Sequence, residues 1–224
     1  MVIKKGADHH QSKLVRAIIF GKTSTRKTGF AIQGLKRGVM IDYERGLGDL
    51  DVPDDLTILE CNTAADYRDA LDHIQENASD YDTVVIDSKT FYGDQLFATL
   101  SDIYSDPKDS LRMWNELDKI SRQRLEQLMS IPLNVIMIFL EDEVVLETGF
   151  RGTYMLYKAK KFKSALEAKF DILIHAEKDK EGNVVRDSSG SNICAGKNRF
   201  AKTLGNDFNK YENFQEVIDT LQSV

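Results

Sequence analysis

The chain has 224 residues, of which 42% are hydrophobic and 29% are charged, as in soluble globular proteins with one sizeable core. Its formal net charge of -6 argues against a surface that is basic throughout and binds nucleic acid everywhere, but it permits a local basic groove. The apolar runs are too short to cross a bilayer, and the polar start MVIKKGADHHQSK lacks the apolar core of a secretion signal, so we expect a cytoplasmic protein without a membrane span.

The first predicted elements are a strand, a polar loop, a helix and a second strand. Residues 14–20 (LVRAIIF) are apolar and partly β-branched and end at Gly21, which predicts a buried parallel strand. A helix is expected at residues 27–35 and a second apolar strand at residues 39–43.

Strands and helices continue to alternate along the chain. The patterns predict strands at residues 56–60, 82–87, 134–140 and 171–177, helices at 63–77, 90–104, 110–130, 164–170 and 214–221, and a hairpin turn at 180–183. This order predicts an α/β fold with one mostly parallel, twisted sheet, helices on both faces and antiparallel strands near the C-terminus. We expect one domain at residues 13–224 after a flexible tail at residues 1–12.

The sequence GKTSTRKT at residues 21–28 lies between the first strand and the first helix. It matches the phosphate-binding pattern G-x-x-x-x-G-K-[ST] at every fixed position except Arg26, where the pattern has glycine because the backbone there is often unfavourable for a Cβ atom. In such a loop the backbone N–H groups and the start of the helix hold phosphates, so the pattern predicts ATP as the ligand. Lys27 is expected to contact the β- and γ-phosphates, and the hydroxyl of Thr28 to bind Mg²⁺. The predicted nucleotide-binding residues are Gly21, Lys22, Thr23, Ser24, Thr25, Arg26, Lys27 and Thr28; a polar turn without a ligand is the alternative.

Carboxylates follow two of the predicted strands. Asp87 ends the strand at residues 82–87, where a P-loop protein needs an acid to hold the water shell of Mg²⁺; a cap for the next helix is the alternative. Asp42 and Glu44 follow the strand after the phosphate loop, so they open onto the carboxyl edge of the sheet, where ligands bind. Glu44 is then a candidate general base for the attacking water.

The order GKTSTRKT, VMIDYE, YDTVVIDS and NVIMIFL resembles the core of RecA-type ATPases, especially the short phage and bacterial proteins built from that core alone. The resemblance covers about residues 14–200 and implies a RecA-like P-loop NTPase in which Glu44 polarises the attacking water and Asp87 is the strand-end acid. Such phage proteins are similar to recombinases that bind single-stranded DNA and promote annealing, which implies a single-stranded DNA partner and a homo-oligomeric ring or filament. The sequence departs from the family at Arg26 and at Glu141, where RecA-like proteins often carry an uncharged polar residue, and both departures argue against efficient hydrolysis.

Residues 148–163 (TGFRGTYMLYKAKKFK) interleave five cations with four aromatic residues and contain no acid. Bases stack on aromatic rings while cations follow the phosphate backbone, which makes the segment a candidate surface for single-stranded DNA. The candidate residues are Phe150, Arg151, Tyr154, Lys158, Lys160 and Lys161. The alternative is an amphipathic segment whose aromatic residues, Tyr157 and Phe162 included, pack on the core while its lysines face water.

Lys197 and Arg199 alternate within AGKNRF, so their side chains are expected to point the same way. The resemblance implies that such a pair reaches across a subunit interface to the neighbour's γ-phosphate; ordinary surface cations are the alternative. Cys61 and Cys194 lie far apart without metal-ligand spacing, so neither a disulfide framework nor a zinc site is expected, and the four histidines receive no role.

Three functions agree with these patterns. The first is an ATP- and Mg²⁺-dependent RecA-like phage recombination protein that acts on single-stranded DNA. The second is a degenerate NTPase in which Arg26 prevents turnover or fills the phosphate pocket itself, so that the domain serves as an oligomeric assembly or DNA-binding module. The third is a small-molecule kinase, for which the sequence lacks an evident Arg-rich lid.

Overall fold

A computed structural model of the protein describes residues 14–145, 151–191 and 194–223. The tail predicted at residues 1–12 and the candidate DNA-contacting residue Phe150 lie outside these ranges.

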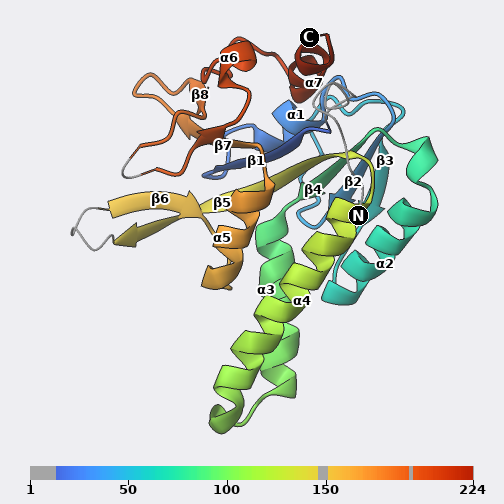
Figure 1. Cartoon of the computed structure of the whole chain (residues 1–224), viewed down its shortest axis with the longest axis vertical. Helices are drawn as coiled ribbons and strands as arrows, with labels where there is room; N and C mark the ends of the chain where they lie inside the picture. The colour runs from blue at the N-terminus through green and yellow to red at the C-terminus, as the bar shows by residue number, and fades with distance from the viewer. Residues whose placement is uncertain (1–13, 146–150, 192–193, 224) are drawn as a thin grey trace, which may run out of the picture.

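One mixed sheet forms the centre of the molecule (Figure 1). Its strands follow the order β3-β2-β4-β5-β1-β7-β8, and every neighbouring pair from β3 to β7 is parallel. The strands are β1 (Arg16–Gly21), β2 (Gly38–Asp42), β3 (Thr57–Glu60), β4 (Thr83–Asp87), β5 (Asn134–Val145), β6 (Arg151–Met155), β7 (Ile172–Lys178), β8 (Val184–Asp187) and β9 (Lys197–Asn198). β8 and β9 pair with β7 in the antiparallel sense, and β6 pairs in that sense with β5. The predicted mostly parallel α/β fold with antiparallel C-terminal strands is therefore confirmed.

Helices cover both faces of this sheet because the residues of its central strands alternate between two apolar layers. The helices are α1 (Lys27–Ile32), α2 (Ala64–Glu76), α3 (Lys89–Ile103), α4 (Ser110–Ser130), α5 (Lys160–Lys169), α6 (Ala201–Leu204) and α7 (Phe214–Gln222). Ile18 and Phe20 of β1 pack in one layer with residues of α2 to α5. Ala17 and Ile19 of the same strand pack in the other layer with α1, α6 and α7. Strands buried on both faces have no polar side to show to water, which explains the continuous apolar runs.

Three elements differ from the sequence prediction. α1 ends at Ile32 and not at residue 35, since Gly34 has a left-handed backbone with a φ of 72°. α5 begins at Lys160, four residues earlier than predicted. β5 continues through its polar residues to Val145 and forms a hairpin with β6, because an antiparallel ribbon needs no second buried face. In the parts of the chain that the structure covers, no helix has both the length and the apolar character required to cross a membrane.

Candidate functional site

The loop between β1 and α1 lies at the carboxyl edge of the parallel strands, with β5 and β7 on either side of β1. It begins at Gly21, where a Cβ atom would lie 2.0 Å from the carbonyl oxygen of Ala176 on β7, so no larger residue fits there. Lys22, Thr23 and Ser24 are exposed at the tip of the loop. Thr25 is buried, and its hydroxyl donates a hydrogen bond to the carbonyl oxygen of Lys22 at 2.8 Å, which closes the turn.

Arg26 is the residue that precedes α1, and its backbone is left-handed, with φ 53° and ψ 32°. This conformation strains a residue with a Cβ atom by about 1 kcal/mol or more, which accounts for glycine in the general pattern. The Arg26 side chain is exposed and lines two clefts that the loop forms with β8 and its neighbours. It does not fill the phosphate pocket, which was one form of the degenerate-NTPase hypothesis.

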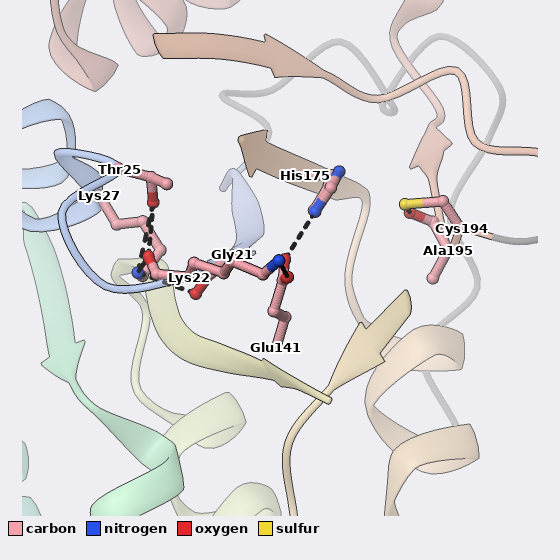
Figure 2. A network of polar contacts seen from close by, with 8 residues as sticks. All are labelled: Gly21, Lys22, Thr25, Lys27, Glu141, His175, Cys194 and Ala195. Carbon is pink, nitrogen blue, oxygen red and sulfur yellow. Dashed lines mark hydrogen bonds and ion pairs between the residues drawn. The ribbon is translucent and has the colours of Figure 1, made fainter. Parts of the chain in front are cut away.

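The amine of Lys27 occupies the inside of the loop instead (Figure 2). Its Nζ atom donates to the carbonyl oxygens of Gly21 at 3.0 Å and Lys22 at 2.6 Å, and it lies 3.4 Å from Oγ1 of Thr25. Burial lowers the pKa of Lys27, while the charges of Asp87, Glu44 and Glu141 act in the opposite direction. A cation is thus held in the turn where the sequence pattern places the phosphates.

Thr28, the residue after this lysine, contacts Asp87. The hydroxyl of Thr28 donates to Oδ2 of Asp87 at 2.5 Å, and the carboxyl group of Asp87 is almost completely buried at the end of β4. Burial raises the pKa of Asp87 to about 7; the hydrogen bond from Thr28 opposes this rise, and the charges of Glu44 and Asp42 add to it. The Asp87–Ser88 peptide bond is cis, and Ser88 caps α3.

The oxygen atoms of Thr28 and Asp87 fit the requirements of Mg²⁺. This ion binds through one or two protein oxygens and takes its other ligands from water and phosphate. No cluster of three or more histidine, cysteine or acidic side chains offers an alternative metal site in the portion of the chain that the structure covers. Thr28 and Asp87 are therefore the residues suited to hold the ion beside a bound triphosphate.

Glu44 is carried to the same edge by the turn after β2. Asp42 lies in register with Asp87, and the backbone N–H of Tyr43 donates to the carbonyl oxygen of Asp87 at 2.6 Å. Oδ1 of Asp42 accepts hydrogen bonds from the backbone N–H groups of Glu44 at 3.0 Å and Arg45 at 2.8 Å. Asp42 thus shapes the turn that exposes Glu44, whose charge acts on both Lys27 and Asp87. The structure brings together Lys27, Thr28, Glu44 and Asp87.

A glutamate and a histidine beside the loop were not predicted as a pair. Oε2 of Glu141 lies 2.9 Å from Nε2 of His175, and its Oε1 lies 3.6 Å from Nζ of Lys22 (Figure 2). Both side chains are largely buried, and the ring of His175 packs on that of Phe20. A signal that could have found the pair is its position near the ends of two predicted strands, residues 134–140 and 171–177, because parallel strands end at the same edge of a sheet. Glu141, at the position where RecA-like proteins often carry an uncharged residue, thus has two basic neighbours, Lys22 and His175.

Lys197 and Arg199 both reach the C-terminal end of α5. Nζ of Lys197 donates to the carbonyl oxygens of Glu167 and Phe170, the latter at 2.6 Å. The guanidinium of Arg199 donates to Oδ1 of Asp171 at 2.8 Å and to the carbonyl oxygen of Ala168 at 3.0 Å. Cations are favoured at this end of a helix, where carbonyl groups lack partners. Within one chain the two residues therefore point the same way but bind α5.

The predicted DNA-binding segment is divided between β6, a short connection and α5. Tyr157 and Phe162 are buried, and the hydroxyl of Tyr157 lies 2.8 Å from that of Ser121. These two rings belong to the core, as the alternative reading stated, and cannot stack with bases.

The candidate residues of that segment keep different degrees of exposure. Tyr154 is half-buried, Lys161 is exposed, and the exposed Lys158 forms an ion pair of 3.6 Å with Asp94. Arg151 begins β6 and Lys160 begins α5. The two cysteines are free, with Cys61 buried and Cys194 half-buried.

Comparison with known proteins agrees with this geometry. The family model of the AAA domain matches residues 13–200, which include the phosphate loop, Glu44, Asp87 and the Glu141–His175 pair. A search of curated proteins found no match. Since the matched segment covers most of the chain and holds every residue of the loop, the protein belongs to the AAA domain family of P-loop NTPases.

Proposed function

We propose that the protein binds ATP with Mg²⁺ at residues 21–28 and hydrolyses it. The observation that carries this proposal is the contact of 2.5 Å between Thr28 and Asp87, directly beside a loop that encloses the amine of Lys27. A turn without a ligand would need neither a buried carboxyl group nor a buried amine, because both are costly to remove from water.

Each residue has a distinct part in this activity. Lys27 supplies a positive charge inside the loop, and its present hydrogen bonds to carbonyl oxygens can be exchanged for bonds to phosphate oxygens. Thr28 and Asp87 would hold Mg²⁺, which when bound neutralises charge on the phosphates. Glu44 is exposed at the same edge and would accept a proton from the attacking water.

Single-stranded DNA is the partner we propose, with the protein acting as a RecA-like, phage-type recombination or annealing protein in the cytoplasm. The exposed Lys158 and Lys161 support this proposal, since both follow the hairpin of β5 and β6, whose β5 strand carries Glu141 beside the phosphate loop. In a homo-oligomer, Lys197 and Arg199 would exchange their contacts with α5 for the γ-phosphate of a neighbour.

A second candidate is a degenerate NTPase that binds nucleotide without turnover and serves in assembly or DNA binding. The left-handed backbone of Arg26 favours it, because a side chain at this position restricts the loop that must adjust around phosphates.

A binding measurement tests the nucleotide site that both functions require. Binding of a fluorescent ATP analogue with Mg²⁺ should weaken about tenfold or more in Lys27→Ala, since a charge-assisted hydrogen bond is lost, and should not change in Lys36→Ala, an exposed lysine remote from the loop. Equal binding by Lys27→Ala and the parent protein would refute the site.

Phosphate release should then be measured with and without oligothymidylate for the parent protein and Arg26→Gly. Turnover in the parent that DNA stimulates supports the recombination protein. Binding without turnover in the parent protein under all conditions, with turnover gained in Arg26→Gly, supports the degenerate NTPase in which Arg26 prevents turnover.

A further inference from the structure

The structure assigns a second phosphate-binding site to Arg26, Lys178 and Arg186, on the side of the phosphate loop that faces the hairpin of β7 and β8. These residues line a cleft of about 320 Å³ together with the polar side chains of Ser24 and Asn183. The site is separate from the interior of the loop, which contains the amine of Lys27.

The pairing of β7 with β8 explains why the cations converge. Ala176 is paired with Arg186 and Lys178 with Val184, so Lys178 and Arg186 project from the same face of the hairpin. β7 also pairs with β1, whose last residue opens the phosphate loop. The Arg26 side chain, at the end of that loop, completes the cleft from the opposite side.

Arg186 is held in an unusual environment for a guanidinium. It is half-buried, its carbon Cζ lies 4.4 Å from the centre of the Phe30 ring, and its Nε atom is buried without a hydrogen-bond partner. Burial lowers the pKa of Arg186, and the like charge of Arg26 lowers it further. In the ranges covered by the structure, no carboxylate lies within ion-pair distance of Arg26, Lys178 or Arg186.

An anion in the cleft would relieve the repulsion between these cations. Two like charges close together are unfavourable, and a phosphate oxyanion between Arg26 and Arg186 would accept hydrogen bonds from the outer N–H groups of their guanidinium groups. The acids nearby, Asp49, Asp51 and Glu212, line the adjacent cleft on the far side of Arg26 and Arg186. The phosphate is therefore expected on the side of Lys178. Arg26, which departs from the phosphate-loop pattern, thereby gains a role of its own.

The ligand is a phosphate group, and it has two sources: a free phosphate or pyrophosphate, or a phosphodiester of a single-stranded nucleic acid. Pyrophosphate and a 20-residue oligothymidylate are the two probes. Both are measured without ATP in a protein that carries Lys27→Ala, so that binding by the loop is weakened and is the same in every variant compared, and a failure of the proposed ATP site does not affect the comparison.

In that background, Arg186→Gln should weaken binding of one of the two probes about tenfold, since its charge-assisted hydrogen bonds to the phosphate are lost. Lys180→Gln, in the exposed turn of the same hairpin, is the matched control and should leave binding unchanged. Lys178→Gln serves as a second test, because this exposed residue can be replaced without disturbing the core. Loss of pyrophosphate binding identifies a free phosphate as the ligand, and loss of oligothymidylate binding identifies a nucleic-acid backbone. If neither probe distinguishes Arg186→Gln and Lys178→Gln from Lys180→Gln, the assignment is wrong.

Discussion

Replacement of Asp87 by asparagine tests the electrostatics of the site most directly. The carboxyl group is buried, and its pKa rises from 3.8 to about 7 in the folded protein. The folded state therefore retains a proton that the unfolded chain loses above about pH 4. Because the folded state binds more protons than the unfolded state between these two pKa values, the free energy of unfolding falls as the pH rises through this window.

The size of this effect follows from the two pKa values. Their difference of about three pH units, at about 1.4 kcal/mol for each, corresponds to an upper limit of about 4 kcal/mol. Asparagine resembles the protonated carboxyl group in shape, and its Oδ1 can still accept the hydrogen bond from Thr28. Asp87→Asn should therefore match the parent protein near pH 4 and be more stable by about 2–4 kcal/mol at pH 8.

Urea denaturation at several pH values between 4 and 8 provides the measurement, with Asp102→Asn, an exposed acid on α3, as the control. Addition of ATP with Mg²⁺ at pH 8 should stabilise the parent protein more than Asp87→Asn, because the variant lacks a carboxylate for the metal. Parallel stability curves for parent and variant across the whole pH range would refute the buried, proton-retaining carboxyl group. If ATP with Mg²⁺ stabilises the parent protein and Asp87→Asn equally, Asp87 does not bind the metal.

Two further substitutions test the packing around the site. Lys89 is fully buried, with Nζ unpartnered between the rings of Tyr67 at 3.9 Å and Tyr92 at 3.7 Å, and burial lowers its pKa well below the usual value. Lys89→Met should raise the free energy of unfolding at pH 7 by about 1–3 kcal/mol. This gain should shrink toward pH 10, because the lysine of the unfolded parent then loses the proton that the folded parent does not bind. A variant less stable than the parent at pH 7 would show that the contacts of Lys89 with the two rings outweigh the cost of its burial. Gly21→Ala should lower the melting temperature by several degrees and abolish ATP binding, because its Cβ would lie 2.0 Å from a carbonyl oxygen. Gly48→Ala, whose Cβ would meet open space, is the control and should have the melting temperature of the parent. Equal melting temperatures of the two variants would contradict the close approach of β1 and β7.

Local patterns in the sequence were sufficient for the sheet and for part of the site. The apolar runs at residues 14–20, 82–87 and 134–140 lie within or overlap β1, β4 and β5, because a strand buried on both faces needs a continuous apolar sequence. The meeting of Lys27, Thr28 and Asp87 was also predictable, since parallel strands place their carboxyl ends at one edge.

Contacts between segments far apart in the chain were decided by the tertiary structure alone. Glu141 and His175 are separated by 34 residues, and only the insertion of β1 between β5 and β7 brings them to the same side of the loop. The buried hydroxyl of Tyr157 likewise pairs with the hydroxyl of Ser121 on α4, a contact that no local pattern identifies.

The sequence by itself therefore determined the α/β class, the phosphate loop and the strand-end acids, because each depends on spacing along a few residues. The register of β7 with β8, and with it the position of Arg186 and Lys178 beside Arg26, was decided only when the chain was folded. The physical reason is that backbone periodicity is a local property, whereas the charge and solvent exposure around a side chain depend on every element that packs against it.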